Sequence, residues 1–148
     1  MTIRVARLDH IQIAAPEGCE SSAREFYGTL LGLPEIAKPE PLRSRGGCWF
    51  QCGPQQLHIG VEREFHPAKK AHPAFVANDL EELHHILLAA GVRVTDDHSL
   101  PGTRRFFAED PWGNRLEFVA GSPWQPANIV AAARSFPRQS RPGIAHLR

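Results

Sequence analysis

Residues 22–32 read SAREFYGTLLG and residues 79–91 read DLEELHHILLAAG, and these two stretches decide the fold. In each stretch apolar side chains recur three and four residues apart, which predicts one buried helical face. Each stretch ends at a glycine, Gly32 or Gly91, and glycine is the residue that most readily adopts the left-handed cap of a helix. The sequence therefore predicts two helices of the same design within one chain.

The strands around these helices repeat as well. Gly32 precedes His58 by 26 residues, the same interval that separates Gly91 from Glu117. Alternating polar and apolar residues predict one strand before each helix and three strands after it. The predicted strands cover residues 3–13, 35–37, 47–52 and 56–61 in the first half, and residues 72–77, 92–95, 104–109 and 115–119 in the second.

A unit with a single helix covers only one face of its sheet and cannot close a core alone, so two such units are expected to pack side by side. The sequence predicts an α+β fold of two βαβββ modules, module one at residues 4–61 and module two at residues 70–119. Together they are expected to form a curved, eight-stranded mixed sheet with the helices outside. Residues 38–45, rich in proline and arginine, are predicted to form a loop.

Short polar motifs predict where each helix begins. Ser22, followed three residues later by Glu25, fits a capping box at the start of the first helix. Asn78 or Asp79 is expected to cap the second helix, because either side chain can accept a hydrogen bond from a free backbone N–H.

The length of 148 residues and the composition predict one globular domain at residues 1–121. A basic, proline-rich arm is expected at residues 122–148, where it either wraps a partner subunit or frays. The hydrophobic fraction is 42% and the net charge is +1, which does not favour nucleic acid as a partner. The sequence has no long apolar run and no signal-peptide pattern, so we expect no membrane segment. The three cysteines match no zinc or redox motif, so we expect free thiols and a cytoplasmic protein.

Four residues with metal-ligating side chains occupy matched places in the two modules. His10 and His72 lie on the first predicted strands, and His58 and Glu117 lie on the last ones. Strand alternation places each of them opposite its apolar neighbours, on the concave face of the sheet. A glutamate in mid-strand is costly to bury unless it is paired or binds a cation. Three imidazoles and a carboxylate suit one divalent metal, Zn, Ni, Mn, Co or Fe(II).

Each of these residues also has a simpler interpretation when it is taken alone. His58 could be a hydrogen-bonded core histidine, and Glu117 could be the ion-pair partner of Arg104, Arg105 or Arg115. The matched positions of all four favour a metal site. The residues expected to line a pocket beside it are Gln12, Trp49, Gln51, Arg104, Arg105 and Phe107.

Several motifs have a familiar pattern: LDHI at 8–11, HPAF at 72–75 and, above all, DPWGNRLEF at 110–118. They resemble the vicinal oxygen chelate superfamily over about residues 5–120. That superfamily includes glyoxalase I, methylmalonyl-CoA epimerase, extradiol dioxygenases, fosfomycin-inactivating transferases and bleomycin-binding proteins. The resemblance implies paired βαβββ modules and a divalent metal, and a homodimer is the usual assembly. Whether the site lies within one chain or is shared across the dimer stays open.

By this resemblance the ligand positions fall on His10, His72 and Glu117, with a fourth at His58, where relatives carry glutamate, glutamine or no ligand. A four-ligand site favours a glyoxalase-like lyase or isomerase acting on a small oxygenated substrate. Glu117 would then be a ligand only, or would leave the metal and act as the base. A three-ligand site favours an extradiol-type dioxygenase or a fosfomycin-type thiol transferase. A non-enzymatic protein that binds a bleomycin-like antibiotic is the remaining alternative, although that class usually lacks the ligands.

Overall fold

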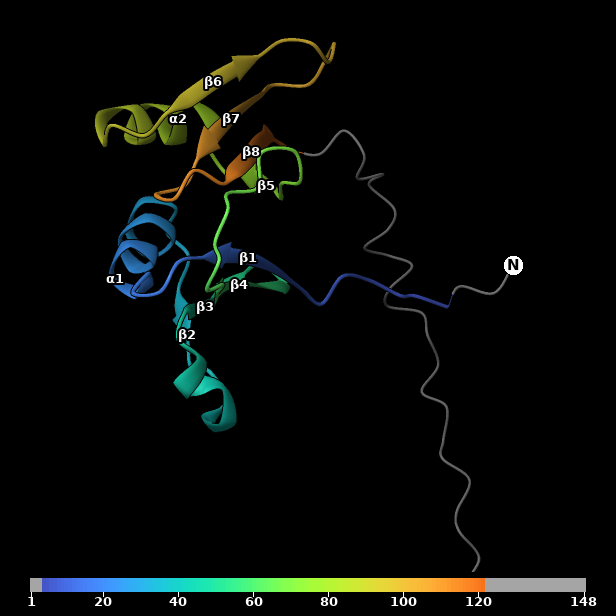
Figure 1. The fold of residues 1–148 in the computed structure, drawn as a ribbon. Helices are drawn as coiled ribbons and strands as arrows, with labels where there is room; N and C mark the ends of the chain where they lie inside the picture. The colour runs from blue at the N-terminus through green and yellow to red at the C-terminus, as the bar shows by residue number, and fades with distance from the viewer. Residues whose placement is uncertain (1–3, 122–148) are drawn as a thin grey trace, which may run out of the picture.

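The computed structural model describes residues 4–121, which form two βαβββ modules in series (Figure 1). Module one contains β1 (His10–Ala15), α1 (Glu20–Ala23) continuing as the π-helical segment η1 (Arg24–Leu30), β2 (Glu35–Ile36), the 3₁₀ helix η2 (Glu40–Arg45), β3 (Cys48–Cys52) and β4 (Gln55–Val61). Module two contains β5 (Ala74–Ala77), α2 (Leu80–Ala89), β6 (Val94–Asp97), β7 (Arg105–Glu109) and β8 (Arg115–Ala120). No helix in this part of the chain is long and apolar enough to cross a membrane.

The predicted α+β architecture of paired modules is confirmed, with the eight strands divided between two sheets. The first sheet has the order β1-β4-β3-β2 and the second has the order β5-β8-β7-β6. In each sheet the first strand of the module runs parallel to the last, and the remaining neighbours are antiparallel. Figure 1 shows the two sheets as separate groups of strands, each with its own helix. This pairing makes the first and last strands of each module neighbours.

The first helix starts earlier than the sequence suggested. It begins at Glu20, with Cys19 at the N-cap position and no side-chain hydrogen bond to the cap. The predicted capping box of Ser22 and Glu25 does not form, because Ser22 already lies inside the helix. The end of the helix is as predicted, since Gly32 adopts a φ of 70° in the left-handed region.

The second helix follows its prediction at both ends. Asp79 is the N-cap, and its side chain accepts a hydrogen bond from the Glu82 N–H. Gly91 follows the last turn with a φ of 75°.

Several strand boundaries and one predicted loop differ from the predictions. β1 begins at His10 rather than at residue 3, and β6 covers 94–97 rather than 92–95. β5 begins at Ala74, so His72 lies just before the strand. The Pro73 carbonyl accepts the Glu117 N–H, but Pro73 has no N–H of its own to donate. The predicted loop at 38–45 contains η2. The C-terminal arm predicted at 122–148 lies outside the described residues.

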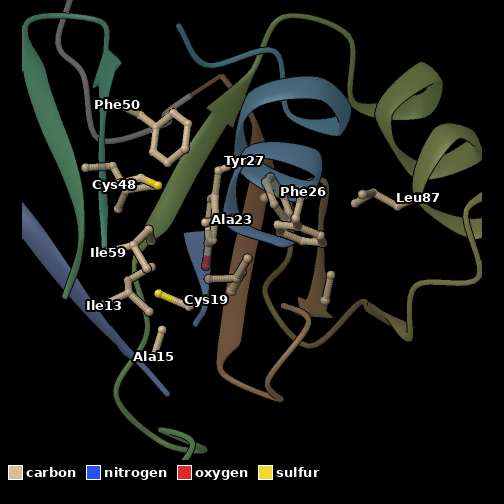
Figure 2. Packing of buried hydrophobic residues seen from close by; sticks show 14 of the residues in the cluster. Ile13, Ala15, Cys19, Ala23, Phe26, Tyr27, Cys48, Phe50, Ile59 and Leu87 are labelled. Carbon is tan, nitrogen blue, oxygen red and sulfur yellow. The ribbon is translucent and has the colours of Figure 1, made fainter. Parts of the chain in front are cut away.

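One hydrophobic core lies between the sheets and the helices. Leu57 and Ile59 of β4 and Leu116 and Phe118 of β8 are at most 2% exposed, so the faces assigned from strand alternation are correct. Figure 2 shows Phe26 and Tyr27 of η1 in this core, with Phe50 and Ile59 nearby and Leu87 of α2 beyond Phe26. The opposite, helix-free face of each sheet carries the polar candidates.

Gly47 lies where no side chain fits, just before β3. Its φ is 79°, and a Cβ there would lie 2.0 Å from the Ile59 carbonyl oxygen of β4. Gly53 also has a positive φ, but a Cβ placed there would have no atom within 4 Å.

We expect Gly47→Ala to lower the free energy of unfolding by about 3 kcal/mol or more, and Gly53→Ala by only about 1 kcal/mol. Urea unfolding followed by circular dichroism measures both, and equal losses would show that β4 yields to the methyl group.

Candidate metal centre

The first sheet brings two histidines and a tryptophan together on its helix-free face. Strand register places Gln12 and Trp49 directly beside His58. The His58 ring stacks on Trp49 with a centroid distance of 3.7 Å, and on His10 with a centroid distance of 4.3 Å. His58 is only 5% exposed. Burial, reinforced by the nearby His10, lowers the pKa of His58, so its ring is held in the neutral form that binds metals.

Both histidines of this pair have one ring nitrogen bound to an acceptor. His10 Nδ1 lies 3.0 Å from the Asp9 carboxylate, and His58 Nε2 lies 2.9 Å from the Gln56 side-chain oxygen. An acceptor requires the proton to sit on the nitrogen that faces it, so the other nitrogen of each neutral ring carries a lone pair. Residues 4–121 offer no hydrogen-bond partner to that second nitrogen of either ring. This is the arrangement that orients metal-binding histidines in proteins.

The second sheet brings His72 and Glu117 together on its own helix-free face. The His72 Nε2 lies 3.0 Å from Glu117 Oε2, while Arg105 Nη1 donates to Glu117 Oε1 over 3.0 Å. Phe107 is paired with Glu117 across β7 and β8, and its ring meets His72 edge-on at 5.5 Å. Glu117 is 8% exposed, so its carboxylate is nearly buried with one arginine and one histidine.

His72 has an acceptor at both ring nitrogens. Its Nδ1 lies 2.8 Å from the Lys70 carbonyl oxygen, and its Nε2 faces the Glu117 carboxylate. A neutral imidazole has one N–H, so it can satisfy only one of these two contacts. The second contact sets a nitrogen lone pair against a carboxylate oxygen, which is repulsive unless a proton or a metal cation lies between them. The side chains present therefore fit a divalent cation shared by His72 and Glu117.

The four candidate ligands form two pairs in this chain, one on each sheet. Within residues 4–121 no group of three or more His, Cys, Asp or Glu side chains is arranged to hold a metal ion. Protein sites for transition metals normally provide three or four ligands. Each pair alone therefore provides fewer ligands than such a site.

Five of the six predicted pocket residues lie on the same faces as the ligand pairs. In the first sheet Gln12, Trp49 and Gln51 share the face of His58, and in the second sheet Arg105 and Phe107 share the face of Glu117. Arg104 does not: it lies on the opposite face, where it donates to the Glu81 side chain of α2 over 2.6 Å. The ion-pair partner of Glu117 is Arg105, which also contacts Asp97 at 2.6 Å.

Comparison with known proteins places this fold and these motifs in one family. The family model described as Glyoxalase/Bleomycin resistance protein/Dioxygenase superfamily matches residues 7–118. The chain belongs to this superfamily. A solved structure from Bacillus anthracis, titled as a glyoxalase family protein, is 51% identical, with a TM-score of 0.79; the match covers 82% of this chain and 100% of that one. No protein in the curated set matches the chain.

More distant solved structures share the fold alone. Lactoylglutathione lyase from Agrobacterium tumefaciens is 20% identical, with a TM-score of 0.66 and coverage of 84% of this chain and 100% of that one. The fosfomycin resistance protein FosX from Listeria monocytogenes is 18% identical, with a TM-score of 0.64 and coverage of 80% and 96%. These two matches show the fold alone, and a shared fold does not by itself imply a shared function.

In this member of the superfamily, a buried network joins the two modules just before Glu117. Asp110 Oδ2 accepts hydrogen bonds from Tyr27 Oη at 2.9 Å and from Asn114 Nδ2 at 2.7 Å. Asn114 also donates to the Ala14 carbonyl of β1 and accepts from the Ala68 N–H of the linker, both over 2.9 Å. Burial of the Tyr27 hydroxyl, together with the nearby Asp110 carboxylate, raises the pKa of Tyr27. The hydroxyl therefore stays protonated and donates its hydrogen bond. The DPWGN segment thus fixes where β8 begins.

Sequence reasoning did not single out two residues beside the ligands, Asp9 and Gln56, and it considered Arg115 only as a possible ion-pair partner of Glu117. Asp9 and Gln56 lie one and two residues before the histidines that they orient, and this short spacing was the only signal in the sequence. The position of Arg115, two residues before Glu117, places it on the Glu117 face of β8.

Proposed function

We propose that the protein is a metal-dependent enzyme of this superfamily, a glyoxalase-like lyase or isomerase acting on a small oxygenated substrate. The observation that carries the proposal is the set of hydrogen-bond partners that the ring nitrogens of the three histidines have. His10 and His58 each have one ring nitrogen without an acceptor, and both ring nitrogens of His72 face oxygen acceptors, one of them the Glu117 carboxylate. The contact between His72 and Glu117 needs a second ring proton or a cation, and a bound metal would satisfy it together with the free nitrogens of His10 and His58.

His10, His58, His72 and Glu117 would hold one divalent metal, Zn, Ni, Mn, Co or Fe(II), which their mixed nitrogen and oxygen donors suit. When bound, the metal supplies Lewis-acid polarisation of two neighbouring substrate oxygens. Arg105 fixes the orientation of Glu117 by donating to Oε1, which leaves Oε2 to bind or to take a proton from the substrate. Trp49, stacked on His58, shields that side of the site from water.

The separation of the ligands into two pairs supports a homodimer with shared sites. A complete set would combine His10 and His58 of one protomer with the partner's His72 and the partner's Glu117. Two such sites would then form around the two-fold axis, because each chain supplies one pair of each kind. The superfamily fold allows this arrangement, and the cytoplasm stays the location expected from the free cysteines.

The buried position of His58 favours four ligands over three. A histidine that is 5% exposed and oriented by Gln56 is placed like a ligand rather than like a surface residue. An extradiol-type dioxygenase or a fosfomycin-type transferase would not need His58 as a metal ligand. A non-enzymatic binding protein would not need any of the four.

Metal content tests the proposal directly. Elemental analysis of untagged protein, purified without chelators, is expected to give about one divalent metal per chain. Glu117→Gln is expected to lose the metal, and His58→Ala to bind it at least about tenfold more weakly. The matched control is His84→Ala, which removes a histidine that pairs with Asp96 away from the site and should keep full metal content.

The other possible metal-binding results distinguish between the alternative functions. Full metal affinity in His58→Ala would favour the three-ligand dioxygenase or transferase. Wild-type protein that takes up no Zn, Ni, Mn, Co or Fe(II) would exclude the enzyme proposal. Circular dichroism of every variant separates loss of the ligand from loss of the fold.

A further inference from the structure

We infer that the helix-free face of the second sheet carries an anion subsite, in which Arg115 binds a carboxylate or phosphate group of the substrate. The inference rests on the proposed function, because the anion would belong to the same molecule that chelates the metal. It narrows the substrate class to small vicinal oxygen compounds with a separate anionic group.

A cavity of about 160 Å³ is lined by residues that include Lys69, Arg93, Phe107, Glu109 and Arg115. Phe107 connects it to the ligand pair, because its ring meets His72 edge-on. Phe107 is paired with Glu117 across the strands, and Glu109 is paired with Arg115. These side chains therefore share the face of Glu117. The cavity is large enough for one anionic group.

Positive charge dominates this cavity. Three cationic side chains line it against the single carboxylate of Glu109. Lys69 and Arg93 both approach that carboxylate, at 3.2 and 3.8 Å. Within residues 4–121 the Arg115 guanidinium has no carboxylate partner. Among the cations that line this cavity, Arg115 is therefore the one whose charge no described carboxylate compensates.

Arg115 is also held in place for this role. Its guanidinium carbon lies 3.9 Å from the centroid of the Phe107 ring, so a cation–π contact fixes the side chain while its N–H donors stay available. Arg105, on the other side of Phe107, is already paired with both Asp97 and Glu117. The two arginines thus have different tasks: Arg105 orients Glu117, and Arg115 faces the substrate.

The spacing along β8 limits the size of the substrate. Arg115 precedes Glu117 by two residues, which is about 7 Å along a strand. A molecule that chelates the metal and reaches Arg115 therefore has its anionic group only a few bonds from its vicinal oxygens. Arginine binds either a carboxylate or a phosphate through paired N–H donors, so both groups belong to the inferred class.

Three chelating probes test the subsite on full-length, Co²⁺-loaded protein. Acetohydroxamate has the vicinal oxygens alone, succinohydroxamate adds a carboxylate, and phosphonoacetohydroxamate adds a phosphonate. Dissociation constants come from the visible Co²⁺ spectrum and from calorimetry. We expect at least one charged probe to bind about tenfold or more tightly than acetohydroxamate, and we expect Arg115→Gln to remove that gain without changing acetohydroxamate binding. The stronger of the two charged probes identifies carboxylate or phosphate.

Two results would overturn the inference. The charged probes could bind no more tightly than acetohydroxamate, or the gain could persist in Arg115→Gln. If no probe alters the Co²⁺ spectrum, the metal proposal fails separately. In that case phosphate is titrated into metal-free protein by NMR. Amide shifts at Thr95, Phe107 and Arg115 that vanish in Arg115→Gln would support the subsite, and no shifts there would refute it.

Discussion

Mixing the His10→Ala and Glu117→Gln variants is expected to restore metal binding that each variant alone has lost. The two substitutions lie in different sheets, and each sheet offers only one pair of ligands. In a dimer with shared sites, a hybrid has one site with both defects and one site with none. Co-refolding equal amounts should recover about a quarter of the wild-type metal content, since half of the dimers are hybrids with one intact site of two.

A second mixture is the matched control for this experiment. His10→Ala and His58→Ala remove ligands from the same sheet, so every site in their hybrids lacks one histidine. This mixture should recover no metal beyond that of its two components. Elemental analysis after gel filtration measures both mixtures. If the His10→Ala and Glu117→Gln mixture also recovers nothing while hybrid dimers are present, the site lies within one chain.

Asp110→Ala is expected to lower the free energy of unfolding by about 3–5 kcal/mol. Asp110 is 4% exposed, and its carboxylate accepts from the Trp112 and Asn114 backbone N–H groups as well as from the Tyr27 and Asn114 side chains. Removing the acceptor leaves buried donors without partners. Tyr27→Phe removes one of these hydrogen bonds and is expected to cost only about 1–2 kcal/mol.

Urea unfolding in the presence of a chelator measures these losses, because chelation removes the stability that metal binding would add. Asp96→Ala is the control: it removes an exposed carboxylate that pairs with His84, and it should change the unfolding free energy by at most about 0.5 kcal/mol. A loss for Asp110→Ala no larger than this control would mean that the network does not join the modules. A large loss identifies the DPWGN segment as the structural connection between module one and the Glu117 strand.

Local sequence patterns determined most of the secondary structure. Helical periodicity and the terminal glycines gave both helices, because a helix buries one face and then needs a left-handed residue to end. Strand alternation placed His58 and Glu117 opposite the core, since the two-residue period of a strand is a local property. The same alternation places Arg104 and Arg105 on opposite faces of the second sheet. The sequence alone did not show which of the two shares the face of Glu117.

The start of the first helix illustrates a limit of local patterns. Ser22 and Glu25 fit a capping box, yet the helix begins two residues earlier, at Glu20. The Glu20 carboxylate accepts the Gly47 N–H over 2.7 Å, and this contact with a residue distant in sequence lowers the pKa of Glu20. A tertiary hydrogen bond of this kind has no signature in the neighbouring residues.

The repeat, the two modules and the faces of His58 and Glu117 could be predicted from the sequence alone. Only the tertiary structure decided which ligands meet: His10 with His58, and His72 with Glu117. The physical reason is that the face of a strand follows from its own alternation, whereas the distance between two sheets follows from how the modules pack. That packing depends on contacts between distant residues, such as Tyr27 with Asp110 and Asn114 with Ala14, which no local pattern encodes.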